Sequence, residues 1–138
     1  MSRRRKVQVQ CPACSHEQSV SAWHSINVTM NAKLREQFFA GEINVLVCKN
    51  CKFVGELPLS LLYHDVNLKF MAYYIPAYQL EEDDLYKTFK TDGTFASPLP
   101  GNDADTANPY GPHIVFSMRE LRRYVIFREH LAGRGAAD

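Results

Sequence analysis

Two tetrapeptides, CPAC at residues 11–14 and CKNC at residues 48–51, contain all four cysteines of this 138-residue chain. Both have the spacing C-x-x-C, and a pair of such motifs is the usual ligand pattern of a tetrahedral metal site. A single ion shared by both motifs would hold two distant parts of the chain together. The sequence therefore predicts one metal site with four thiolate ligands, which are Cys11, Cys14, Cys48 and Cys51.

Geometry and free energy both favour this shared site. A Zn–S distance of about 2.3 Å places tetrahedral sulfur atoms about 3.8 Å apart, a separation that residues i and i+3 of a tight turn can reach. Pro12 suits such a turn because its ring fixes φ. Closing the 33-residue segment between the motifs costs roughly 3 kcal/mol of chain entropy. Structural zinc contributes roughly 10–16 kcal/mol, so the metal outweighs this cost.

Four thiolates fill every position around a tetrahedral ion, which leaves no place for water or substrate. We therefore predict a structural Zn²⁺ rather than a catalytic one, although Fe²⁺ also accepts four tetrahedral sulfur ligands. Two alternatives use the same cysteines: a pair of disulfides, which needs an oxidising compartment, and a redox-active dithiol, which needs only one motif. His16 could replace one thiolate, but a solvated turn residue is the simpler interpretation.

The composition is typical of a soluble, single-domain protein. Apolar residues make up 46% of the chain and charged residues 22%, as in ordinary globular domains. No apolar run approaches the roughly 20 residues that cross a bilayer. The basic start of the chain has no apolar core behind it, as a secretory signal would have. We therefore expect a cytoplasmic protein without membrane contact.

The charge is nearly balanced overall but unevenly distributed. The formal net charge of +1 becomes −1 when four thiolates (−4) and one Zn²⁺ (+2) are added. A nearly neutral domain is not expected to bind phosphate backbones broadly. The first residues are nevertheless strongly basic, and we expect residues 1–8 to form a flexible arm. Its cations are Arg3, Arg4, Arg5 and Lys6.

Alternating, strand-like segments flank each cysteine pair, and two hairpins that face each other across one metal form a zinc ribbon. These segments are residues 6–10, 17–28, 43–47 and 53–57. Between the hairpins, residues 31–40 are predicted to form a helix. Asn31 is its expected N-cap, and Gly41 can end it.

The rest of the domain is expected to add a sheet and a second helix. Residues 69–75 (KFMAYYI) are apolar on both faces, which is typical of a strand covered on both sides or packed against a partner. Residues 59–65 are predicted to form a short turn or helix. Residues 117–131 are predicted to form an amphipathic helix that begins with the capping box Ser117-Met-Arg-Glu120.

Two segments are expected to differ from the ordered part of the single domain, which spans residues 9–131. Residues 88–112 hold three of the seven glycines and four of the seven prolines, so we expect a mobile surface loop. Residues 132–138 are expected to form a frayed tail. The predicted fold class is α+β: a zinc ribbon elaborated with an antiparallel β-sheet and flanking helices.

Six stretches, taken in order, resemble the CpXC domain of bacteria and archaea. They are CPAC (11–14), SINV (25–28), CKNC (48–51), LLYHD (61–65), FMAYYIP (70–76) and ELRRYVIF (120–127). The resemblance covers roughly residues 9–131 and implies a compact domain built on a four-cysteine site, but it implies no activity. Ser15 and Lys52 depart from the pattern of many zinc knuckles, in which glycine follows C-x-x-C.

The most enzyme-like cluster is Tyr63-His64-Asp65, in which a histidine adjoins a carboxylate. Residues adjacent in sequence rarely face each other, and no nucleophile motif accompanies them. We therefore predict no catalytic residues. An enzyme that uses His64 and Asp65 is the weaker alternative.

We predict a non-catalytic binding module whose partner is a protein. Self-association is included, because residues 70–75 carry more apolar surface than one small sheet face covers. The main alternative is binding to RNA or single-stranded DNA through cations and aromatic side chains. The candidate contacts for a partner or nucleic acid are Arg3, Arg4, Arg5, Lys6, Lys49, Lys52, Arg122 and Arg123.

Overall fold

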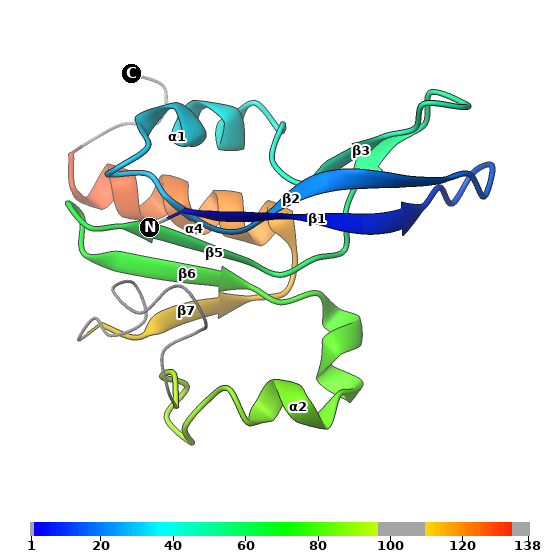
Figure 1. The fold of residues 1–138 in the computed structure, drawn as a ribbon. Helices are drawn as coiled ribbons and strands as arrows, with labels where there is room; N and C mark the ends of the chain where they lie inside the picture. The colour runs from blue at the N-terminus through cyan, green and yellow to red at the C-terminus, as the bar shows by residue number, and fades with distance from the viewer. Residues whose placement is uncertain (1, 97–109, 134–138) are drawn as a thin grey trace.

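The computed structural model describes residues 2–96 and 110–133. A five-stranded sheet with the order β1-β2-β5-β6-β7 runs through the molecule, and a separate two-stranded hairpin, β3-β4, lies at one end of it (Figure 1). The strands are β1 (Arg3–Gln10), β2 (Glu17–Asn27), β3 (Val45–Val47), β4 (Val54–Glu56), β5 (Leu61–Asp65), β6 (Phe70–Tyr74) and β7 (Pro112–Val115). The helices are α1 (Ala32–Phe39), the 3-10 helix η1 (Ala77–Glu81), α2 (Asp83–Tyr86) and α4 (Met118–Leu131).

The sheet is mixed, so the prediction of an antiparallel sheet was wrong. Strands β1–β2 and β5–β6 pair antiparallel, but β2–β5 and β6–β7 pair parallel. Parallel neighbours need a long crossover connection, and both parallel pairs have one. Residues 28–60 join β2 to β5, and residues 75–111 join β6 to β7. Hydrophobic alternation identifies a strand but does not reveal the direction of its neighbour.

Helices α1 and α4 cover one face of the sheet and enclose the main core (Figure 1). Aromatic rings form its centre: the ring centroid of Tyr63 lies 4.8 Å from that of Phe38 and 6.0 Å from that of Phe70. The two helices are also joined by a buried ion pair between Arg35 and Glu129. The other buried residues of this core are Ile26, Val28, Leu34, Ile43, Leu61, Ala72, Tyr74, Val115, Met118, Leu121 and Val125.

The opposite face of β5 and β6 is also covered from within the chain. Leu62 and Met71 are buried against Phe95, with Phe89 and Tyr110 packed beside them. This confirms that β6 is apolar on both faces. It removes the reason for which self-association was predicted, because neither face of β6 needs a partner to cover it.

The predicted mobile loop at residues 88–112 is only partly described. Residues 97–109 lie outside the described residues. Before them, Phe89 and Phe95 form an isolated β-bridge, and their rings stack with centroids 5.5 Å apart. After them, Pro112 begins β7. The described flanks of this segment are therefore part of the packed domain.

Residues 61–65 form strand β5, so the predicted turn or helix at 59–65 was wrong. All five side chains of β5 are buried, because the strand lies in the middle of the sheet and is covered on both faces. Such a strand shows no alternation of polar and apolar residues. A short apolar run of this kind cannot be distinguished from a helix by its periodicity.

Both long helices lie where they were predicted. Helix α4 begins after Ser117, whose hydroxyl accepts a hydrogen bond from the N–H of Glu120 at 3.0 Å. The Glu120 carboxylate accepts a bond from Arg123. Leu121 is buried beneath the helix, whereas Leu131 is exposed at its end.

The basic start of the chain differs from the expected flexible arm. Residues 3–8 belong to β1 and pair antiparallel with β2, with an irregularity in the register at Arg3 and Arg4.

Within the described part of the chain, the helices are too short or too polar to span a membrane.

Candidate metal centre

The four cysteine sulfur atoms lie in one cluster. All of them lie within 4.8 Å of one another, and the Sγ–Sγ distances of Cys11–Cys51 and Cys14–Cys48 are both 3.6 Å. A tetrahedral zinc site has its sulfur atoms about 3.8 Å apart, whereas a disulfide needs about 2.05 Å. Both short distances join one hairpin to the other. The cluster can therefore hold one metal ion that links the two hairpins.

The two cysteine turns have the same backbone structure. The N–H of Cys11 donates to the carbonyl of His16 at 2.9 Å, and the equivalent N–H of Cys48 donates to Phe53 at 2.8 Å. The residues that precede these two acceptors also bond in the same way: the N–H of Ser15 donates to the Cys11 carbonyl, and the N–H of Lys52 donates to the Cys48 carbonyl. Each pair of bonds closes a tight turn whose two sulfurs point toward the centre of the cluster. Each turn can therefore supply two ligands to one metal ion.

Ser15 and Lys52 adopt the conformation that glycine usually supplies. Their φ angles are +65° and +68°, in the left-handed region that L-residues rarely adopt. The two departures from the usual glycine therefore change the residue without changing the backbone. This backbone conformation directs N–H groups of the turn toward the sulfurs, as the Ala13 N–H lies 3.4 Å from Cys11 Sγ.

Replacing Lys52 by glycine is expected to stabilise the metal-loaded protein by up to about 1 kcal/mol. The left-handed conformation costs a side-chain-bearing residue about 1–2 kcal/mol, and the freedom of glycine in the unfolded chain offsets about 0.5–1 kcal/mol of that gain. Denaturant unfolding of the zinc-loaded protein measures the difference. Lys49→Gly is the matched control, because it removes the same charge from the same turn at a residue without a positive φ. Lower stability of Lys52→Gly would contradict the expectation.

The cluster is half-buried, with one shielded cysteine in each turn. Cys11 and Cys48 are buried, and Cys14 and Cys51 lie nearer to solvent. The buried pair packs in a small apolar core with Ala22, Leu46 and Leu57. This core is separate from the one beneath the helices, and it contains residues of both hairpins.

Two polar residues that the sequence analysis missed join the hairpins beside the cluster. The side chain of Gln18 donates to the Val47 carbonyl at 3.2 Å and accepts from the Lys49 N–H at 3.0 Å. The side chain of Asn44 accepts from the N–H of Trp23 at 2.7 Å and donates to its carbonyl at 2.9 Å. Each side-chain amide thus makes the pair of backbone hydrogen bonds that a neighbouring strand would otherwise make. For Gln18 a signal existed, because it shares the parity of Val20 and Ala22, which face inward.

The surroundings of the cluster shift the pKa values of its thiols in both directions. The pKa of Cys14 is lowered to about 6, because the side chain of Asn50 and the backbone of His16 donate hydrogen bonds to its sulfur. The backbone N–H of Phe53 likewise lowers the pKa of Cys51, yet burial and the other three cysteines, which resist a further charge, outweigh it and raise the pKa to about 12. A bound divalent cation would relieve this repulsion.

The candidate contact residues do not form one patch. Arg3, Arg4, Arg5 and Lys6 are exposed along β1, while Lys49 and Lys52 are exposed in the second cysteine turn. About seven strand residues, or roughly 20 Å, separate Arg4 from the first cysteine turn. On α4, Arg122 is half-buried and Arg123 is exposed and paired with Glu120.

His64 and Asp65 lie in the interior of the protein. Each of these two residues is 1% exposed to solvent. His64 Nε2 and the Tyr110 hydroxyl are 2.5 Å apart, and the Asp65 carboxylate accepts bonds from the Thr29 hydroxyl and the Leu68 N–H. Because they are consecutive in a strand, their side chains point to opposite faces of the sheet. The two side chains therefore do not face each other.

Taken together, the fold and the site define a mixed α+β protein with a four-cysteine cluster that can bind a metal. The chain belongs to the CpXC protein family, whose sequence model matches residues 9–133. This confirms the resemblance found in the sequence. No curated protein and no solved structure matches the chain.

Proposed function

We propose that this CpXC protein is a non-catalytic, cytoplasmic interaction module, in which one structural Zn²⁺ on Cys11, Cys14, Cys48 and Cys51 completes a zinc ribbon. The single observation that carries the proposal is the convergence of four sulfur atoms within 4.8 Å. Two identical turns, one from each hairpin, supply two sulfurs each. An ion held in this way has all its positions filled, so it can stabilise structure but has no open position for a substrate.

The choice of zinc rests on the ligands and their surroundings. Four thiolates at tetrahedral spacing suit Zn²⁺, which is almost always tetrahedral in structural sites and does not change its oxidation state. Hydrogen bonds to sulfur support the site: the backbone N–H of Ala13 lies 3.4 Å from Cys11 Sγ, and the Asn50 amide lies 3.5 Å from Cys14 Sγ. Such donors reduce the negative charge on the cluster.

The absence of a catalytic role is supported by the location of the candidate residues. His64 and Asp65 are buried and are engaged in holding Tyr110, Thr29 and Leu68. A general base must come within hydrogen-bond reach of a substrate, and these side chains are covered by the protein itself.

Purified protein is expected to contain one zinc ion per chain. Elemental analysis measures the stoichiometry, and replacement by Co²⁺ tests the ligands, because cobalt bound by four thiolates has strong visible and sulfur charge-transfer absorption. The matched control is the Cys14→Ser protein, in which the thiolate bands should weaken. Protein that contains no metal and develops no cobalt bands would overturn the proposal.

Binding to RNA or single-stranded DNA is a second candidate that one observation favours. The guanidinium carbon of Arg4 on β1 lies 5.0 Å from the centroid of the Trp23 ring on β2, so a cation and an aromatic ring adjoin across the two strands. Complexes of this kind weaken steeply as salt rises. A gel shift at low salt that Arg4→Ala abolishes would favour this candidate over a protein partner.

A further inference from the structure

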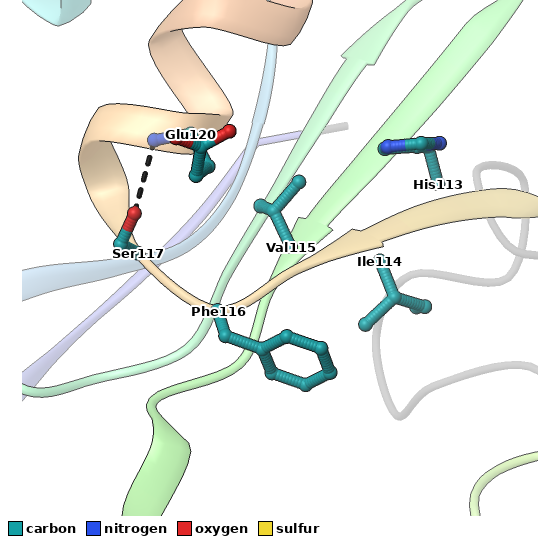
Figure 2. Close-up of a pocket in the computed structure, with 6 residues that line it drawn as sticks. All are labelled: His113, Ile114, Val115, Phe116, Ser117 and Glu120. Carbon is teal, nitrogen blue, oxygen red and sulfur yellow. Dashed lines mark hydrogen bonds between the residues drawn. The ribbon is translucent and has the colours of Figure 1, made fainter.

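Strand β7 forms an open edge of the main sheet. It pairs with β6 on one side, and no described strand pairs with its other side. Beside it is a shallow hollow of about 370 Å³, whose lining includes the strand and the first turn of α4 (Figure 2). The residues are His113, Ile114, Val115, Phe116, Ser117 and Glu120.

The backbone directions at this edge follow from one hydrogen bond. The carbonyl of Val115 accepts from the N–H of Ile75 at 2.9 Å, so it points toward β6. The planar trans peptide then directs the N–H of Phe116 away from β6. Because successive residues of a strand alternate, both the N–H and the carbonyl of Ile114 also point outward. The open edge therefore presents a donor and an acceptor at Ile114 and a donor at Phe116.

The two edges of the sheet differ in their protection. Edge strands are commonly protected by charged side chains, which prevent pairing with another chain. Strand β1 has four consecutive cations, residues 3–6, at one edge. Strand β7 has no formally charged residue besides His113, and the exposed ring of Phe116 follows it. Proline at its first position is its main protective feature.

We propose that β7 pairs antiparallel with β7 of a second copy of this chain, about a two-fold axis at Ile114. This inference rests on the proposed role as an interaction module, and it names one partner and one surface. At the axis, each Ile114 donates its N–H to the other Ile114 and accepts the other's N–H. The two five-stranded sheets become one continuous sheet.

The side chains at this edge are complementary to themselves under the same axis. The pairing places Phe116 opposite Pro112 of the second copy. The Phe116 N–H then donates to the Pro112 carbonyl, and this bond does not need the N–H that proline lacks. Ile114 and Phe116 point to the same side of the strand in Figure 2, away from α4. No pair of like formal charges is brought together, unlike a similar pairing of β1.

Helix α4 provides further apolar surface on the other side of the edge. Tyr124 stacks on His113 with ring centroids 3.9 Å apart, so this flank of the helix lies beside β7. The Phe127 ring, which is 56% exposed, adjoins Tyr124. A short strand alone would form a small interface, and this flank can enlarge it toward the size of stable dimers.

A charge exchange at Ile114 tests the proposal. The full chain should sediment as a dimer, at twice 15.8 kDa. Ile114→Lys and Ile114→Asp should each be monomeric, because each places like charges at the axis. An equimolar mixture of the two should form a heterodimer, which loss of folding could not produce. Val54→Lys is the matched control, since Val54 is an exposed strand residue in the hairpin β3-β4, and this variant should stay dimeric.

Hydrogen exchange gives a second measurement on the wild-type chain. The outward N–H of Ile114 should be protected at high micromolar concentration and lose that protection on dilution. A monomer at high micromolar concentration, or an Ile114→Lys protein that remains dimeric, would overturn the proposal and leave this edge to another partner or to none. Zinc content and cobalt absorption are measured on the same samples. A monomer that holds one zinc would refute the dimer alone, and metal-free protein would refute the proposed function.

Discussion

Cys48→Ser is expected to unfold the hairpin end of the protein at room temperature. A structural zinc site contributes roughly 10–16 kcal/mol, and a whole domain is stable by only about 5–15 kcal/mol. Cys48 is fully buried at the end of β3, so its loss also leaves a ligand position facing the small core. The measurements are zinc per chain and the thermal unfolding curve. We expect less than one zinc per chain and a lower unfolding temperature.

Ala13→Ser is the matched control for this variant. It adds a hydroxyl to an exposed position in the other cysteine turn and leaves all four sulfurs in place, so zinc content and unfolding should match the wild type. Removal of the metal by a chelator should reproduce the effect of Cys48→Ser, and added Zn²⁺ but not Mg²⁺ should reverse it. A Cys48→Ser protein that unfolds at the wild-type temperature would show that the metal does not hold the hairpins.

The cysteine cluster could be predicted from the sequence because its signal is local. Each C-x-x-C pair specifies its own turn, and the metal chemistry specifies that the two pairs meet. The strand segments at residues 43–47 and 53–57 followed for the same reason, and β3 and β4 lie within them. Local signals of this kind do not require any knowledge of the rest of the fold.

The direction of the central strands could not be predicted, because it depends on distant parts of the chain. The parallel pairing of β2 with β5 places Ser25 beside Leu62 and Asn27 beside His64. Nothing in the sequence around residues 61–65 indicates this register. Gln18 on β2 and Asn44 in the turn before β3 raise the same difficulty at the site: each amide looks polar and exposed until the other hairpin packs against it.

A second large effect is expected at the ion pair between α1 and α4. The carboxylate of Glu129 is fully buried, and Arg35 binds it with two nitrogens, at 2.8 Å from Nε to Oε2 and 2.5 Å from Nη2 to Oε1. The two residues lie 94 positions apart, so the pair fixes the C-terminal helix against a helix that lies between the two cysteine turns. Arg35 also lies over the Phe39 ring, with 5.0 Å between its guanidinium carbon and the ring centroid.

Arg35→Ala is expected to lower the free energy of unfolding by about 3–5 kcal/mol, because it removes the two-nitrogen arginine contact from a fully buried carboxylate. Glu129→Gln should cost less, since the guanidinium that it leaves behind is 25% exposed and can reach water. Arg123→Ala is the matched control: it breaks an arginine–glutamate pair on the same helix with Glu120, but that pair is exposed and should contribute less than about 1 kcal/mol. Denaturant unfolding of the zinc-loaded proteins ranks the three. Equal costs for Arg35→Ala and Arg123→Ala would mean that burial of Glu129 does not govern how the two helices are held together.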